Sequence, residues 1–190
     1  MKRAAWCVLP VAALLAGCAS NPEQSIYIMA APANEQEAAQ ANPGRIVIKL
    51  QPVILPDFLD TTDLMTRTGR YGVQASRTGR WGERLSKGVT STLAADLGQR
   101  LRPGIVVDGP VETASVQIDV TVSAFDVTET ASVLAASWTV TWPGAGHSPM
   151  VRQGMFATGI ARPGGDLAAV AAMAATVGKL SDGIAATIRG

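Results

Sequence analysis

The stretch ASVQIDVTVSAF, residues 114–125, decides the fold of this chain. Apolar and polar residues alternate over residues 116–123, which predicts a strand with one buried face. The alternation then changes parity, because Phe125 and Val127 are the next large apolar residues. A shift by one position indicates a β-bulge near residues 123–124.

Two further strands are predicted downstream of this stretch. Over residues 134–142 an apolar side chain recurs at every second position, ending with Trp138, Val140 and Trp142. Residues 143–149, PGAGHSP, predict a turn, and residues 151–161 predict another strand. Consecutive strands joined by short turns favour an antiparallel meander.

The upstream half predicts shorter strands. Residues 26–30 predict a first strand, and residues 31–44 a polar loop. Residues 45–56, RIVIKLQPVILP, predict another strand, although Pro52 and Pro56 exclude a central position for its second half. Residues 63–76 predict a hairpin about Gly69 and Gly72.

Two helices complete the pattern. Residues 80–101 carry a large apolar residue at every fourth position, beginning with Trp81 and Leu85, and Pro103 with Gly104 ends this segment. The last helix is predicted after a Gly-Gly-Asp cap at residues 164–166, with apolar residues at helical spacing from Leu167 onward. The fold class predicted is α+β, a mostly antiparallel sheet with two helices packed on one face.

The N-terminus predicts export and lipidation. Lys2 and Arg3 precede an apolar segment, residues 4–16, of signal-peptide length. Residues 15–18, LAGC, resemble a bacterial lipobox, in which Cys18 takes a diacylglyceryl group and its amine a third acyl chain. Two or more chains give stable anchoring. The alternative is an ordinary secretory signal with an incidental cysteine. Ala19, where enteric-type sorting would use aspartate for the inner membrane, favours the outer membrane.

These observations divide the chain into three parts. Residues 1–17 are the predicted signal peptide, residues 18–25 a lipidated tether, and residues 26–190 a single α+β periplasmic domain. Cys7 leaves with the signal and Cys18 is acylated, so the mature chain has no free thiol and no disulfide. Without Lys2 and Arg3, its 14 basic and 15 acidic residues give a net charge of −1. This near-neutral net charge gives no reason to predict binding to nucleic acid.

No catalytic, cofactor or metal site is predicted. His147 is the only histidine and lies in a Gly/Pro turn, so the mature chain lacks a set of His and Cys ligands. No G-x-S-x-G elbow or phosphate loop occurs. Asp57 and Asp60 are a candidate pair of carboxylates only because they are close in sequence. We therefore expect a protein that is not an enzyme.

One local feature carries excess charge. Residues 67–87, RTGRYGVQASRTGRWGERLSK, hold six cations against Glu83 alone. We call the six the basic strip; they are Arg67, Arg70, Arg77, Arg80, Arg84 and Lys87. The strip is either a solvated edge that deters aggregation, or a surface for lipid headgroups or an acidic partner.

The order of these features resembles a known family. The residues that carry the resemblance are IVIKLQPVILPDFLD at 46–60, GRWGERLSKGVTSTLAADL at 79–97, the following meander and the C-terminal helix. Together with the lipobox they resemble the PqiC-type ABC-transport auxiliary lipoproteins over essentially the whole mature chain. The family often has alanine at the position of Gly82.

The resemblance implies a function. Such lipoproteins accompany MCE-domain proteins, which are thought to form hydrophobic conduits for phospholipids between the two membranes, together with an ABC permease and ATPase. The chain would be a docking subunit on the periplasmic face of the outer membrane that supports membrane integrity. A sheet edge or the basic strip would receive the tip of the conduit.

Two other functions stay open. The first is a scaffold or activator of a cell-wall synthase. The second is a lipid-binding carrier, with a cavity lined by Trp138, Trp142 and Met155. The oligomeric state is also open, a homo-oligomer included.

Overall fold

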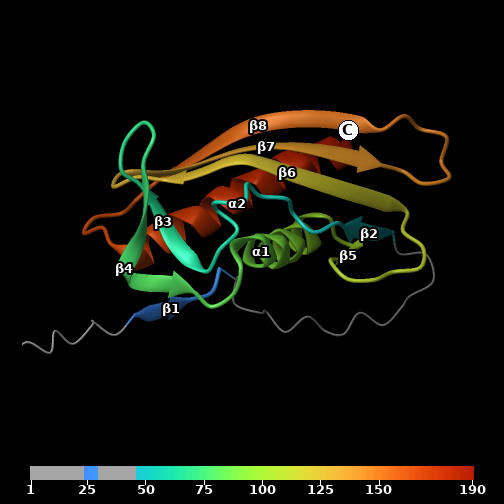
Figure 1. Cartoon of the computed structure of the whole chain (residues 1–190). Helices are drawn as coiled ribbons and strands as arrows, with labels where there is room; N and C mark the ends of the chain where they lie inside the picture. Colours follow the sequence, from blue (N-terminus) through green and yellow to red (C-terminus); the bar gives the residue numbers. More distant parts are fainter. Residues whose placement is uncertain (1–23, 30–45) are drawn as a thin grey trace, which may run out of the picture.

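A computed structural model describes residues 24–29 and 46–190. Five strands form the larger sheet, in the order β5-β2-β6-β7-β8 (Figure 1). Their bounds are β2 (Val47–Leu50), β5 (Ile105–Val107), β6 (Val116–Val127), β7 (Ala131–Thr141) and β8 (Met150–Gly159). The predicted signal peptide and most of the tether, Cys18 included, lie outside the described residues.

The predicted meander is confirmed. Strands β6, β7 and β8 follow one another as antiparallel neighbours. The register between β6 and β7 shifts between Val122 and Ala124, which is where the change of parity predicted a bulge. Because of this shift, Phe125 and Val127 stay buried on the same side as Val120.

The segment with two prolines behaves as predicted only in part. Strand β2 ends at Leu50 and pairs in parallel with β5 on one side and β6 on the other. Beyond Pro52 the chain is no longer a strand, but it continues beside β6, where the amide of Ile54 donates to the carbonyl of Val120 (3.1 Å). The short strand β5 was not predicted from the sequence.

A second, smaller sheet holds the predicted hairpin. It contains β1 (Ser25–Tyr27), β3 (Asp63–Arg67) and β4 (Val73–Trp81), in the order β1-β4-β3. Strands β3 and β4 are antiparallel, and β1 pairs in parallel with the end of β4. The single sheet expected from the sequence is therefore two sheets. The α+β class is confirmed, with antiparallel pairing in the hairpin and the meander, and parallel pairing of the short strands β1, β2 and β5 with their neighbours.

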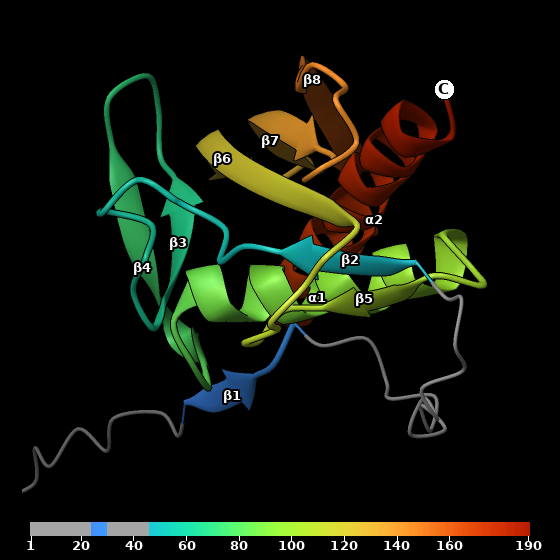
Figure 2. The ribbon, with the colours of Figure 1, turned by 90° about the vertical axis from the view of Figure 1, so that its right-hand side faces the viewer.

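Both helices lie on the same face of the larger sheet (Figure 2). They are α1 (Leu85–Arg100) and α2 (Asp166–Arg189). The predicted start of α1 at residue 80 is wrong, because Trp81 still belongs to β4 and its amide donates to the carbonyl of Thr62 (2.8 Å). Leu167, predicted on the buried face of α2, is 70% exposed.

The core lies between the sheet and the two helices. Apolar side chains from the inner face of β6 and β7 meet those of α1 and α2; the fully buried ones include Ile118, Leu134, Val140, Leu93, Leu97, Val177, Leu180 and Ile184. By length and composition α2 could cross a membrane, but Leu180 and Ile184 show that its apolar face is used for packing here. Among the described residues, no helix covers the opposite face of β6, β7 and β8 (Figures 1 and 2).

Candidate functional site

The β3–β4 hairpin stands out from the rest of the molecule (Figure 1). Its loop is closed by a hydrogen bond from the amide of Thr68 to the carbonyl of Gly72 (3.0 Å). Gly69 has a φ of +151°, in the region that favours glycine. At the base of the loop, Arg67 forms a 2.5 Å ion pair with Asp126 on β6. This pair fastens the hairpin to the larger sheet.

The structure divides the basic strip into two halves. Arg67 pairs with Asp126, Arg84 with Asp60 (3.1 Å), and Lys87 with Glu83 (3.1 Å). Two of these carboxylates, Asp60 and Asp126, lie outside the sequence window that gave the local excess of charge. Among the described residues no carboxylate pairs with the remaining three cations, which are Arg70, Arg77 and Arg80.

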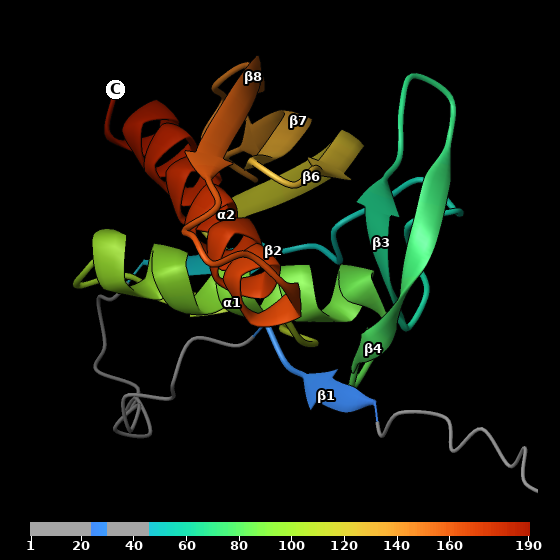
Figure 3. The ribbon, with the colours of Figure 1, turned by 90° about the vertical axis from the view of Figure 1, so that its left-hand side faces the viewer.

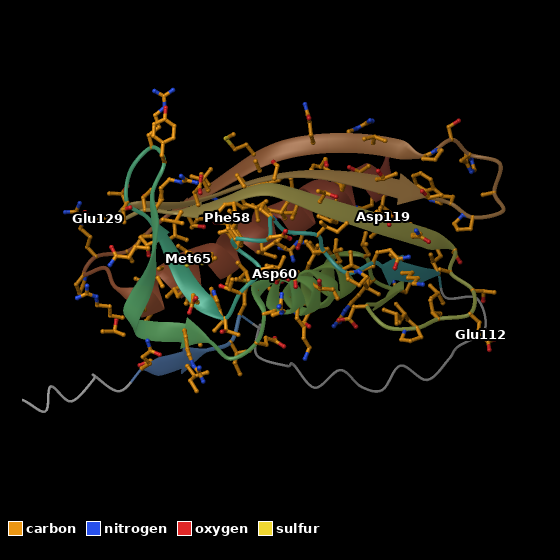
Figure 4. The ribbon with its side chains drawn as sticks, viewed as in Figure 1. Phe58, Asp60, Met65, Glu112, Asp119 and Glu129 are labelled. Carbon is orange, nitrogen blue, oxygen red and sulfur yellow. The ribbon has the colours of Figure 1, made fainter. Side chains whose placement is uncertain are left out.

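Asp60 holds the start of α1 in place. Its carboxylate accepts the amide of Ser86 (3.0 Å) and a hydrogen bond from Arg84, and it lies beside the first turn of the helix (Figure 4). Burial opposes ionisation, but the bonds from Ser86 together with Arg84 outweigh it, so the pKa of Asp60 lies below its ordinary value.

A bulge in β4 sets the position of two of the unpaired cations, Arg77 and Arg80. The register between β3 and β4 shifts, since Asp63 faces Arg80 while Met65 faces Ala75. Within the bulge, the hydroxyls of Ser76 and Thr78 donate to Asp166 Oδ2, at 2.8 and 2.7 Å. Asp166 is the first residue of α2. The bulge is thereby fixed to the helix.

Exposed apolar side chains lie next to these cations. Ile26 and Ile28 are 60% and 62% exposed, and Ile26 lies opposite Arg80 in the pairing of β1 with β4. At the tip of the hairpin, Tyr71 is 89% exposed and the guanidinium of Arg70 lies 5.4 Å from the centre of its ring. The three-stranded sheet therefore combines apolar, aromatic and basic groups on its surface.

The free edge of β8 is a second candidate. The amide of Ile160 donates to Thr130, so the antiparallel pattern turns the backbone groups of Val151, Gln153, Met155 and Ala157 away from β7. Lys179 binds the carbonyl of Ala157 and Arg152 that of Val151. Gln153 and Met155 form the middle of this edge, between the two cations.

The cavity expected for a lipid carrier is not formed by the predicted residues. Trp138 is buried in the core, where its indole N–H donates to Thr187 (3.1 Å), whereas Met155 is 74% exposed on the opposite face. Trp142 packs against the core and lies 6.3 Å, between ring centres, from His147 in its turn. The outer face of the sheet has an open depression of about 530 Å³, lined by residues that include Ser123, Ala135, Ser137, Gln153 and Met155.

No metal ligands were predicted from the sequence. Within residues 24–29 and 46–190, no three His, Cys, Asp or Glu side chains are grouped closely enough to hold a metal ion. The sequence analysis did not identify which residues form the free edge of β8. Only the position of residues 151–161 as the last predicted strand could have indicated it.

Comparison with known proteins gives one family and one fold. The family model described as ABC-type transport auxiliary lipoprotein component matches residues 27–185. The chain is 25% identical over 121 residues to the intermembrane transport lipoprotein PqiC of Escherichia coli (strain K12). That alignment covers 64% of this chain and 65% of the relative.

Two solved structures share the fold. The crystal structure of an uncharacterized protein matches with a TM-score of 0.72 at 20% identity, over 87% of this chain and 99% of the other. Protein XCC0632 from Xanthomonas campestris matches with a TM-score of 0.60 at 10% identity, over 76% of this chain and 86% of the other.

Proposed function

Because this chain belongs to the ABC-type transport auxiliary lipoprotein component family, whose model matches residues 27–185, we propose that it is a docking subunit of an intermembrane phospholipid transport system. It carries out no chemistry itself. It holds the periplasmic end of the system at the outer membrane and so supports membrane integrity. The extent of the family match is the observation that carries this proposal.

Cys18 supplies the anchor in this proposal. The acyl chains on its sulfur and amine insert into the outer membrane, and the folded part hangs from them on the periplasmic side. Six residues separate Cys18 from Ser25, the first residue of β1. Such a short connection cannot carry the domain across the periplasm, so the partner has to come to it. The relative named an intermembrane transport lipoprotein supports this arrangement.

The partner is an MCE-domain protein, which works with its ABC permease and ATPase. We place the contact on the free edge of β8, because Gln153 and Met155 turn backbone donors and acceptors outward there. An extended segment of the partner would add a strand to this edge, and main-chain hydrogen bonds would supply much of the affinity. Arg152 and Lys179 occupy the carbonyls on either side, which limits the added strand to the middle of β8.

The depression on the outer face extends this contact. It adjoins Gln153 and Met155 and is walled by small residues, among them Ala135 and Ser137. Met155 and Val151, which are 74% and 62% exposed, stand on the same face at the edge. A side chain of the added strand would therefore pack against the apolar side chains of Met155 and Val151, next to the backbone hydrogen bonds.

Affinity purification of the full acylated chain from detergent-solubilised membranes tests the proposal. We expect the MCE-domain protein of the same cell to be retained, and a strain without that protein to yield none of its associated subunits. Retention of a cell-wall synthase in its place would favour the scaffold alternative. Phospholipid bound to the purified chain by native mass spectrometry, with no protein partner, would favour the carrier.

A further inference from the structure

We propose that the three-stranded sheet lies against the membrane surface and makes a second, non-covalent contact with anionic lipid headgroups. The contact is made by the membrane-facing surface, defined as Ile26, Ile28, Arg70, Tyr71, Arg77 and Arg80. This inference rests on the proposed acylation of Cys18. It does not depend on the identity of the protein partner.

The tether limits how far this sheet can be from the bilayer. A fully extended chain of seven residues reaches about 25 Å, so Ser25 stays within about that distance of the acylated cysteine. Ser25 pairs with Gly79 on β4. Tyr71 precedes Gly79 by eight residues, which is about 26 Å along a strand. The β1 end of the surface therefore stays near the bilayer, and the tip of the hairpin reaches the headgroups when β4 lies along the membrane.

The apolar part of the surface lies beside the tether. Ile26 lies in β1 and Ile28 directly follows it, and both residues are more than half exposed. The amide of Gly82 donates to the carbonyl of Tyr27 (2.8 Å), which holds β1 against the end of β4. Exposed isoleucines that accompany basic residues are typical of segments that lie in the membrane interface.

The three arginines of the membrane-facing surface outnumber the carboxylates that lie near them. Arg70, Arg77 and Arg80 have no carboxylate partner among the described residues, whereas the other half of the basic strip is paired. Asp63 faces Arg80 in the register but forms no ion pair with it. Asp166 is engaged by the hydroxyls of Ser76 and Thr78. Guanidinium groups suit lipid phosphates, and each cation near an anionic surface adds to the attraction.

The tip of the hairpin has the composition of an interfacial anchor. Tyr71 is 89% exposed and Arg70 lies over its ring. Tyrosine is favoured at the headgroup level because its ring is apolar and its hydroxyl is polar. The cations alone would also suit an acidic protein, but the predicted anchor at Cys18 holds the isoleucines and the cations beside them close to a bilayer. The observations therefore favour the membrane.

This orientation leaves the proposed docking edge free. Figure 3 shows the three-stranded sheet along one side of the molecule, from β1 at the bottom to the hairpin loop at the top. Strand β8 lies on the other side of β7 and β6, in the order of the larger sheet. A domain that rests on the membrane through the smaller sheet can thus present β8 to the periplasm.

Lipid quenching of site-specific labels on the full acylated chain tests the inference. Because the acylated chain has no free thiol, Thr68→Cys and Gln24→Cys each give one labelling site beside the surface without changing its residues. His147→Cys and Gln153→Cys are matched controls far from it. In vesicles of phosphatidylethanolamine and phosphatidylglycerol containing brominated lipid, we expect labels at 68 and 24 to be quenched several-fold more than the controls.

The charge requirement is tested by a triple variant. Arg70→Gln, Arg77→Gln and Arg80→Gln together should abolish most of the quenching at position 68. A control with Arg102→Gln, Arg152→Gln and Arg189→Gln removes the same charge from exposed sites elsewhere and should leave the quenching unchanged. Raising the ionic strength should reduce the quenching of the parent chain, because salt screens these charges.

The outcomes separate this inference from the proposed function. An acylated chain, verified by intact mass, whose four labels are quenched equally would overturn the membrane-facing surface and leave the anchor intact. Cross-linking of position 70 to an acidic protein, with no quenching at 68, would do the same. An intact mass without acyl chains would overturn the anchor and this inference together.

Discussion

The hydroxyl of Ser76 donates a 2.8 Å hydrogen bond to Asp166, ninety residues later in the chain. Through this bond, and its counterpart from Thr78, the bulge in β4 is joined to the first residue of α2. The smaller sheet, which carries the hairpin and the exposed arginines, is thereby fixed to the helix that packs under β7 and β8. The surface proposed to contact the membrane and the edge proposed for docking are therefore connected through α2.

Removal of this carboxylate should loosen that connection. We expect Asp166→Ala to lower the free energy of unfolding by about 1–3 kcal/mol, because two hydroxyls lose their acceptor and the helix N-terminus loses a favourable negative charge. Urea denaturation followed by circular dichroism measures the change. Asp108→Ala, at an exposed site, is the control and should change stability by less than about 0.5 kcal/mol. Equal effects of the two substitutions would contradict the assigned role.

Gly79 lies against Asp166 and Tyr27, and this close contact leaves no room for a side chain. A Cβ at this position would lie 2.6 Å from Asp166 Oδ2 and 2.6 Å from the ring of Tyr27. We expect Gly79→Ala to destabilise the chain by about 1–3 kcal/mol, since the helix start or β1 has to move. Gly109→Ala, where no atom lies within 4 Å of the added carbon, is the matched control. A thermal melt that shows no difference between them would argue against this packing.

The ion pair at the start of α1 predicts a pH dependence. The pKa of Asp60 in the folded chain is below its ordinary value of 3.8, so the folded state favours the ionised form. Its contribution to stability is complete well above pH 3.8 and is lost as the pH falls through the folded pKa. The stability difference between the parent and Asp60→Asn should therefore shrink on acidification below about pH 4. A difference that stays constant to pH 2 would contradict it.

Backbone pairing at β8 can be tested without altering the core. Gln153→Pro removes an amide that faces away from β7, so the internal ladder keeps its bonds, whereas Gln153→Ala keeps the amide and removes only the side chain. We expect the proline variant to lose the partner protein in affinity purification and the alanine variant to retain it. The midpoint of thermal unfolding should change little in either. Full retention by the proline variant at unchanged stability would exclude strand addition at this residue.

The sequence predicts best where a pattern repeats along one strand or helix. The bulge near residues 123–124 could be located because the change of parity that leads to Phe125 is visible within one strand. Trp81 misled the prediction for α1, because it falls on the fourfold spacing of Leu85 and Val89 although it ends a strand. The spacing alone carries no information about the hydrogen bond that Trp81 makes to Thr62.

Contacts between distant segments could not be predicted in this way. The pairing of Ser25 with Gly79 joins two strands with no shared periodicity. The basic strip is visible in the sequence as a local excess of cations, but the pairing of two of its members with Asp60 and Asp126 depends on how the strands come together. For the same reason the sequence could not separate the neutralised half of the strip from Arg70, Arg77 and Arg80.

Docking through β8 can be tested by photo-cross-linking in living cells. A photoreactive residue at Met155, on the free edge, is compared with one at Gln117, on the outer face of β6. We expect a cross-link from position 155 to an MCE-domain protein, none from position 117, and none in a strain that lacks the partner. Equal cross-links from both positions, or a cross-link from 155 only to proteins outside the transport system, would contradict it.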